Sequence, residues 1–210
     1  MPETESTSLY FSTLHPKSRH RFCYALNDTF AAINRSRPLV FLCIGSDRAT
    51  GDSLGPLVGQ RLSDGLYCRK SGLTSSLGNK KTAVYGTLRQ TVHAGNLKST
   101  LSEIQNRFQN PYIIAIDASL GIPEHIGYVT LGKGSLRPGI GVSHNLPETG
   151  DIHITGIVNH SGVNNHITLQ TTRLLTVMEL ASFIADGILD ALHVGASLQR
   201  PQKSHFINVF

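Results

Sequence analysis

Two uninterrupted apolar runs of strand length constrain the fold more than any other feature of the sequence. They occupy residues 39–44 and 112–116. A strand that is apolar on both faces is typical of a parallel sheet covered by helices on both sides. Apolar residues at helix-like spacing predict helices at residues 19–35, 53–69, 96–108 and 166–192. This alternation of strands and helices predicts a three-layer α/β/α fold with a mostly parallel sheet.

The rest of the chain fits a single domain. Shorter strand patterns lie at residues 82–86, 126–131 and 151–158, and one of them could add an antiparallel strand. Residues 1–17 are polar and rich in Ser and Thr, which indicates a flexible N-terminal arm. We therefore expect one α/β/α domain over residues 18–210, a length that can bury roughly 70% of the unfolded surface.

Composition narrows the class of protein. Hydrophobic residues make up 40% and charged residues 16% of the chain, as in globular proteins. No apolar run is long enough to cross a bilayer, and the N-terminus lacks the pattern of a secretory signal. The three cysteines show no C-x-x-C spacing, which fits free thiols in the cytoplasm. The net charge of +5 comes from scattered Lys and Arg, so we expect a solvated surface with no nucleic-acid or membrane partner.

The first apolar run ends in a loop punctuated by glycines, C-I-G-S-D-R-A-T-G-D-S-L-G-P over residues 43–56. Such loops often bind phosphate through backbone N–H groups. Here five residues separate Gly45 from Gly51, and an aspartate follows where a P-loop has lysine. Asp52 would repel phosphate, so the loop presents a carboxylate at the start of the next helix, where it could also act as the N-cap.

A second aspartate, Asp117, follows the second apolar run. Functional groups of open α/β sheets gather at the carboxyl ends of the strands, so Asp52 and Asp117 are expected to converge on one crevice. Either could instead serve only a cap or a turn. Held close together, two carboxyls divide into a protonated and an ionised member, which suits general acid–base chemistry on water. The same pair could bind a divalent metal with a histidine.

Six motifs resemble the YyaC-type sporulation proteins of endospore-forming bacteria. Besides the 43–56 loop they are V-Y-G-T-L (84–88), V-H-A-G-N-L (92–97), I-A-I-D-A-S-L-G (114–121), R-P-G-I-G-V (137–142) and G-D-I-H-I-T-G-I-V-N (150–159). That family is similar to the germination protease that degrades small acid-soluble spore proteins, and more distantly to hydrogenase-maturation endopeptidases. T-G-D-S-L-G-P stands where the protease has T-P-D-A-L-G-P, and I-A-I-D-A matches its second acidic motif.

The resemblance implies an aspartic-type peptidase of the phosphorylase/hydrolase-like fold. Its catalytic residues would be Asp52 and Asp117, its substrate a protein of the spore-forming cell, and no cofactor is expected. We expect the crevice to be lined for substrate by Gly45, Asp47, Arg48, Ser119, Gly139 and Gly141. Ser119 could hydrogen-bond an aspartate, and the glycines let the backbone approach the crevice.

Two alternatives stay open. One is a catalytically inert binding protein that keeps the peptidase fold and recognises a partner in the crevice. The other is a metal-dependent endopeptidase of the hydrogenase-maturation type, for which His144 and His153 are the weak candidate ligands. Homo-oligomerisation is possible in each case.

Overall fold

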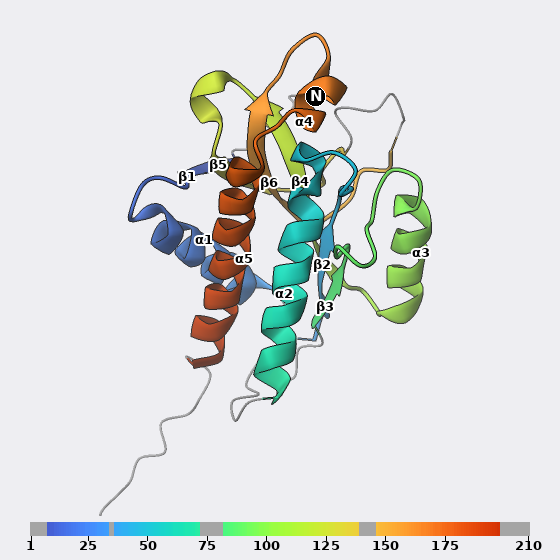
Figure 1. Ribbon diagram of the computed structural model, residues 1–210. Coiled ribbons are helices and arrows are strands. Elements are labelled where there is room, and N and C mark those ends of the chain that lie inside the picture. The colour runs from blue at the N-terminus through green and yellow to red at the C-terminus, as the bar shows by residue number, and fades with distance from the viewer. Residues whose placement is uncertain (1–7, 34–35, 72–81, 139–145, 198–210) are drawn as a thin grey trace, which may run out of the picture.

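The computed structural model describes residues 8–33, 36–71, 82–138 and 146–197. Within them a six-stranded sheet runs in the order β1-β5-β6-β4-β2-β3 and lies between two layers of helices (Figure 1). The expected three-layer α/β/α fold is confirmed.

The centre of the sheet is parallel. β2 (Leu39–Cys43) lies between β3 (Thr82–Tyr85) and β4 (Tyr112–Gly121), and β4 pairs in turn with β6 (Ile152–His160). All five residues of β2 are buried, as the uninterrupted apolar run predicts for a strand covered on both faces. The mostly parallel character of the sheet therefore follows from its four central strands.

The other two strands, β1 and β5, are paired antiparallel. β1 lies in the segment that we expected to be a flexible N-terminal arm. β5 (Tyr128–Lys133) pairs antiparallel with β6, and β1 (Leu9–Ser12) pairs antiparallel with β5. Part of the segment assigned to a flexible arm is thus an edge strand of the sheet. Phe11 explains why: its side chain is 3% exposed and packs against Phe22, with ring centroids 5.2 Å apart. That burial anchors a strand too short to be recognised from local pattern.

Helices α1 (Ser18–Ala32), α2 (Leu54–Ser71) and α5 (Leu174–Ser197) share one apolar core with one face of the sheet. Helix α3 (Leu97–Arg107) closes the opposite face through a smaller core with β2. α2 connects β2 to β3, and α3 connects β3 to β4. Each is a crossover of the kind that parallel neighbours require.

The predicted closing helix over 166–192 is divided in two. α4 (Asn165–Gln170) ends before Thr171, and α5 begins at Leu174. Thr172 Oγ1 donates to the Thr168 carbonyl over 2.7 Å, and Asn159 Nδ2 donates to Thr172 Oγ1 over 3.2 Å. Threonine hydroxyls bonded to nearby backbone compete with helix formation, so this link turns the chain between the two helices.

Two glycines bring α2 into backbone contact with the sheet, as their spacing on one helix face suggests. A Cβ added to Gly55 would lie 1.9 Å from the carbonyl oxygen of Ile44, and one added to Gly59 would lie 1.9 Å from that of Gly86. No side chain fits at either position. The close approach holds the first turns of α2 directly against the end of β2.

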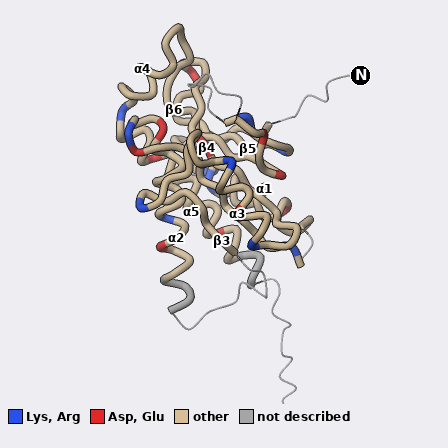
Figure 2. The backbone as a smooth tube through the Cα atoms, turned by 90° about the vertical axis from the view of Figure 1, so that its right-hand side faces the viewer, with Lys and Arg blue, Asp and Glu red and all other residues tan. Residues whose placement is uncertain are grey.

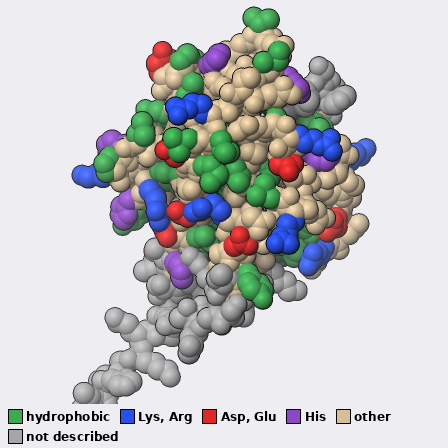
Figure 3. Space-filling model, viewed as in Figure 1, with side chains coloured by type: hydrophobic (Ala, Val, Ile, Leu, Met, Phe, Trp, Pro, Cys, Tyr) green, Lys and Arg blue, Asp and Glu red, His purple; other side chains and the backbone are tan. Residues whose placement is uncertain are grey.

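Charged residues are spread over many elements. Lys, Arg, Asp and Glu are scattered along the tube of Figure 2, and exposed hydrophobic, basic and acidic side chains are interspersed on the face drawn in Figure 3. Arg19, for example, pairs with Asp190 between α1 and α5 over 2.6 Å. Among the described helices, none combines the length and the apolar character that crossing a bilayer requires.

Candidate active site

The end of β2 is fixed by two backbone hydrogen bonds to different neighbours. The Ile44 N–H donates to the Ile116 carbonyl over 2.7 Å, and the Gly45 N–H donates to the Val92 carbonyl over 2.8 Å. The chain thus moves away from β4 at Gly45. Gly45 has φ +138°, and an added Cβ would collide with the carbonyl oxygen of Asp52, so the turn requires glycine here.

The loop delivers Asp52 in the middle of a 3₁₀ turn, η1 (Gly51–Ser53), that runs directly into α2. The position of Asp52 in the sequence suggests that it is the N-cap of α2. In the structure it lies inside this turn and is not the N-cap. The Ser46 N–H donates to the Asp52 carbonyl over 3.1 Å, and Ser53 Oγ donates to the Thr50 carbonyl over 2.6 Å. These bonds hold the loop closed on itself and fix where the Asp52 side chain begins.

The surroundings of the Asp52 carboxyl favour its protonated form. Burial raises the pKa of Asp52 above that of an exposed aspartate, because removal from water penalises the charge. A backbone hydrogen bond from Ser46 and the nearby charges of His93 and His166 act in the opposite direction. Burial is the largest of these effects, so the carboxyl stays protonated to a higher pH than usual.

Asp117 lies within β4 and not after its end, which corrects the expected strand boundary. β4 continues to Gly121 because it pairs with β6, where Asp117 lies opposite Thr155. On its other side the last register pair with β2 is Cys43 with Ile116. Asp117 is therefore the first residue of β4 beyond the end of β2. Its side chain is 6% exposed, and its Oδ1 accepts the Ala118 N–H over 2.8 Å, which orients the carboxyl.

The order of the strands explains why both aspartates belong to one edge. From β2 the chain crosses outward to β3 and then returns to β4 on the other side of β2. Open α/β sheets bind ligands at such a reversal, outside the carboxyl ends of the strands. The η1 turn that carries Asp52 contacts β4, the strand that carries Asp117. The structure thus places both predicted acids at the β2–β4 reversal.

A chain of hydroxyl groups lies beside Asp117, and the sequence did not reveal it. Thr130 Oγ1 and Thr155 Oγ1 are 2.7 Å apart, and Ser119 Oγ donates to Thr155 Oγ1 over 3.2 Å. Thr130 and Thr155 are both buried. Ser119 thus bonds to Thr155. Only the register of β4, β5 and β6 reveals this cluster, because its members come from three strands.

The remaining predicted site residues are distributed differently. Asp47 and Arg48 lie exposed in the loop that follows β2, and neither forms an ion pair with a described residue. His153 lies in β6, two residues before Thr155, with Nδ1 3.1 Å from the Gly134 carbonyl oxygen. Three further predicted residues, namely Gly139, Gly141 and His144, lie outside the described residues.

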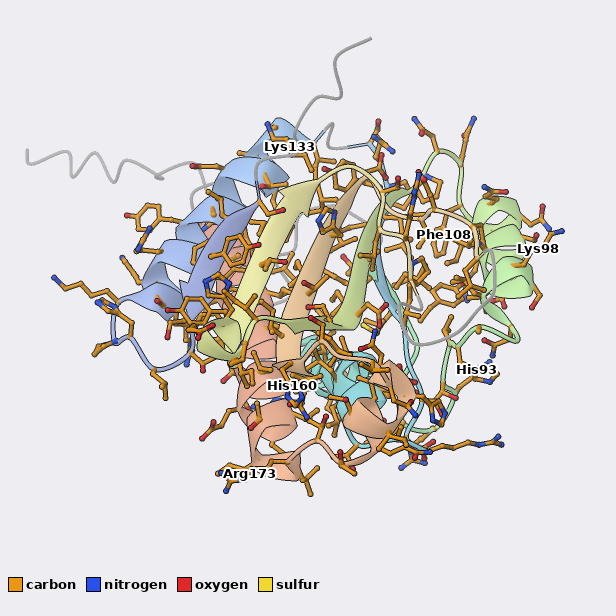
Figure 4. The ribbon with its side chains drawn as sticks, turned by 90° about the horizontal axis from the view of Figure 1, so that it is seen from above. His93, Lys98, Phe108, Lys133, His160 and Arg173 are labelled. Carbon is orange, nitrogen blue, oxygen red and sulfur yellow. The ribbon has the colours of Figure 1, made fainter. Side chains whose placement is uncertain are left out.

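Two histidines from distant segments lie near Asp52. His93 precedes α3, where its N–H donates to Asn96 Oδ1 over 2.8 Å and its Nδ1 accepts the Gly95 N–H over 3.1 Å. That acceptor role leaves Nε2 to carry the proton in the neutral ring. His166 lies in α4. Figure 4 looks down on the carboxyl ends of the strands and shows His93 on the α3 side, across from His160. Neither histidine is among the site residues that the sequence predicts.

A metal centre is not formed by the part of the chain that the structure describes. Within it, no group of three or more His, Cys, Asp or Glu side chains is arranged to hold an ion. Asp52, His93 and His166 do not form such a group. We therefore derive no chemistry through a metal at this edge.

Comparison with known proteins relates the chain to a sequence relative, a solved structure and a family model. The chain is 46% identical over 152 residues to the uncharacterized protein YyaC of Bacillus subtilis (strain 168), an alignment that covers 72% of this chain and 68% of YyaC. Its fold resembles the crystal structure of the NiFe hydrogenase maturation protease HycI from Thermococcus kodakarensis, with 18% identity and a TM-score of 0.46. That match covers 80% of this chain and 99% of HycI.

The third match is to a family model and covers residues 11–187. It includes β2 to β6, α1 to α4 and the first part of α5, and with them the whole β2–β4 edge. Together with the identity to YyaC, it confirms the YyaC-type family that the motifs indicated, while a role in sporulation stays a prediction. The chain belongs to the family described as Protein of unknown function (DUF1256).

Proposed function

We propose that this protein is a peptidase that hydrolyses a peptide bond in a protein substrate with Asp52 and Asp117 as its acid–base pair. One observation carries the proposal. Asp117 is the first residue of β4 beyond the end of β2, and the loop that leaves β2 brings Asp52 back in a turn that contacts β4. Two carboxyls at a strand-order reversal form an arrangement suited to acid–base hydrolysis.

The electrostatics suggest how the roles divide. Burial raises the pKa of Asp52, so we propose Asp52 as the proton donor. We propose Asp117 as the base, because its Oδ1 accepts the Ala118 N–H, a hydrogen bond that favours the ionised form. Asp117 takes a proton from water as the water oxygen attacks the peptide carbonyl carbon. Asp52 donates its proton to the departing amine nitrogen as the C–N bond breaks. The products are a carboxylic acid and an amine, and no other reactant is consumed.

The motif resemblance supports the same reaction class by analogy. Both acidic motifs of the germination protease have counterparts here, T-G-D-S-L-G-P and I-A-I-D-A, and they contain Asp52 and Asp117. On this basis we propose a cytoplasmic protein substrate in a spore-forming cell. Gly45, whose conformation brings Asp52 into place, and Ser119, which follows Asp117 along β4, are proposed to adjoin the bound substrate.

Cleavage can be tested on the proteome of a sporulating Bacillus subtilis culture. Purified protein is incubated with the extract, and new protein N-termini are labelled and sequenced by mass spectrometry. We expect wild-type protein to generate new N-termini, and Asp117→Asn to lower their rate of appearance by about 10²–10⁴-fold, the usual contribution of a general acid or base. Asp52→Asn should have a similar effect.

Asp64→Asn is the matched control, because Asp64 is an exposed aspartate on α2 whose carboxylate accepts a hydrogen bond only from Gln60 within the described residues. It should cleave like wild type. Unchanged cleavage by Asp117→Asn would refute the acid pair. Stable binding of one extract protein without cleavage would identify an inert binding protein, and loss of cleavage with a chelator would identify a metal-dependent enzyme. Either outcome contradicts the proposal.

A further inference from the structure

Strand β4 extends past its neighbour β2 and leaves one side of its backbone uncovered. β2 pairs with β4 as far as Cys43 with Ile116, whereas β4 continues to Gly121 along β6. Residues 117–121 therefore have a strand on one side only. This open edge of β4, residues 117–121, begins at Asp117.

The direction of each backbone group along the open edge follows from the bonds lower in β4. The Ile113 carbonyl accepts the Asp151 N–H from the β6 side, and the Ile116 carbonyl accepts the Ile44 N–H from the β2 side. N–H and C=O groups alternate between the two sides of a strand with a period of two. The Gly121 carbonyl accepts the Ser161 N–H on the β6 side, so the alternation holds past the register shift between Ser119 and Leu120. The backbone groups of Ala118 and Leu120 therefore point toward the space that β2 has left.

One of those groups is already used, and the others are open. The Ala118 N–H, which would bond to β2 if β2 continued, donates instead to Asp117 Oδ1. For the Ala118 carbonyl and the N–H and carbonyl of Leu120, β2 offers no partner, and among the described residues no loop or turn backbone group bonds to them. Residues 118–121 are half-buried, whereas Ile114–Asp117 of the same strand are buried. Unpaired strand edges of this kind are templates for a further strand.

We propose that the open edge of β4 binds an extended segment of the protein substrate as an added β-strand. This inference rests on the proposed peptidase function for its choice of occupant. An extended peptide supplies both a donor for the Ala118 and Leu120 carbonyls and an acceptor for the Leu120 N–H. Asp117 begins the edge, and the turn carrying Asp52 contacts the same strand. A peptide that pairs with Leu120 would therefore lie along the strand that carries Asp117.

Backbone pairing also predicts what the site recognises. Main-chain hydrogen bonds supply affinity for any extended sequence, and side chains that point to alternate faces supply selectivity. Ile122, directly after the strand, is 53% exposed and offers an apolar contact for one such side chain. The substrate class is therefore an unfolded or extended segment, such as a chain terminus or a loop, and not a folded helix.

The test measures binding without cleavage. Full-length Asp52→Asn protein, labelled with ¹⁵N, is titrated with a mixture of short random-sequence peptides while its amide signals are followed by NMR. We expect the Leu120 amide to shift and to exchange more slowly with solvent. The same peptides with N-methylated backbones, which cannot form a strand ladder, should leave Leu120 unchanged.

A pair of variants separates the backbone from the side chain. Leu120→Pro removes the N–H that faces away from β6, and proline is tolerated at such edge positions, so the β4–β6 ladder should persist. Peptide affinity should fall about tenfold, the equivalent of one good hydrogen bond. Leu120→Ala also removes the leucine side chain, but it keeps the backbone N–H. It should bind peptides as tightly as the Asp52→Asn protein with Leu120 intact.

Three results would overturn the inference. They are equal peptide binding by Leu120→Pro and Leu120→Ala, shifts confined to residues outside 117–121, and protection of Leu120 by dimerisation in the absence of peptide. Because binding is read in a variant that lacks one acid, failure of the catalytic proposal would leave these measurements unaffected. Conversely, cleavage that depends on Asp117 but tolerates Leu120→Pro would retain the peptidase and reject the added strand.

Discussion

The Ile44 N–H donates to the Ile116 carbonyl over 2.7 Å, and beyond this bond β2 and β4 separate. Gly45 turns away toward Val92, while β4 continues with Asp117 as its next residue. The same bond thus marks where the Asp52 loop starts and where β4 becomes an open edge. If β4 were shifted by one residue relative to β2, Asp117 would lie on the other face of the sheet, because side chains alternate along a strand.

The raised pKa of Asp52 predicts an unusual pH dependence of stability. At a pH below the pKa of an unfolded aspartate, about 3.9, the Asp52 carboxyl is protonated in both the folded and the unfolded state. Its ionisation then has no effect on the free energy of unfolding. As the pH rises from there to the higher pKa of the folded state, the unfolded chain loses its proton first, so the free energy of unfolding falls. Asp52→Asn should remove this fall. The test is urea denaturation at several pH values. The free energy of unfolding of wild type minus that of Asp52→Asn should fall as the pH rises from the unfolded pKa to the folded pKa, and should stay level above it.

Glu148 provides the control of opposite sign. Its hydrogen bond from Arg137 lowers its pKa, so its contribution to stability is present above the unfolded value and disappears as the pH falls through the folded value. The free energy of unfolding of wild type minus that of Glu148→Gln should therefore rise as the pH rises through this range. Equal slopes for the two variants would contradict the assigned environment of Asp52.

Gly55→Ala should destabilise the fold. The added Cβ would lie 1.9 Å from the Ile44 carbonyl oxygen, a backbone atom that can move only if the end of β2 moves. We expect a loss of about 1–3 kcal/mol in the free energy of unfolding, as in other overpacked sites. Gly162→Ala is the control, since its Cβ would approach no atom closer than 3.9 Å. Equal stability of both variants in chemical denaturation would show that α2 can shift away from β2.

Thr155→Val should reveal the hydroxyl chain beside Asp117. The variant removes the partner of Thr130 and of Ser119, and leaves the buried Thr130 hydroxyl without its bond to Thr155. The expected cost is about 1–3 kcal/mol in the free energy of unfolding. Adding Thr130→Val should recover part of this cost, because both members of the buried pair are then apolar. A purely additive double mutant would argue against a coupled pair.

Cys43 should resist alkylation in the folded protein. Its side chain is fully buried in β2, and burial raises the pKa of its thiol far above the usual value, so the reactive thiolate is scarce. Mass spectrometry after iodoacetamide treatment should show slow modification of Cys43 in native buffer and rapid modification in guanidinium. Cys23, which is only half-buried, should react faster than Cys43 in the native state. Native labelling of Cys43 at the denatured rate would contradict its position in the core.

Local sequence was sufficient for several features of this protein. The apolar run at 39–44 predicts a strand buried on both faces, and the glycines that follow it predict a tight loop; the structure shows both. These features depend on hydrophobic patterning and backbone sterics within a few residues. The placement of Asp52 and Asp117 after such strands was therefore predictable, although their roles remain proposals.

Features that join distant segments were not predictable in this way. β1 exists because Phe11 reaches Phe22, and the link between α4 and α5 forms where Thr172 meets Asn159. His166 comes near Asp52, and Thr130 near Thr155, only after the strands and helices have packed. Each of these contacts joins two different segments of the fold, so no local pattern encodes it.

The sequence alone determined the parallel α/β architecture and the two acidic motifs, because both follow from short-range patterns. Tertiary structure decided how far β4 extends beyond β2, and with it the position of Asp117 relative to the loop of Asp52. The physical reason is that strand length in a sheet is set by pairing: β6 supports β4 through Gly121, whereas the tight turn at Gly45 takes β2 away after Ile44.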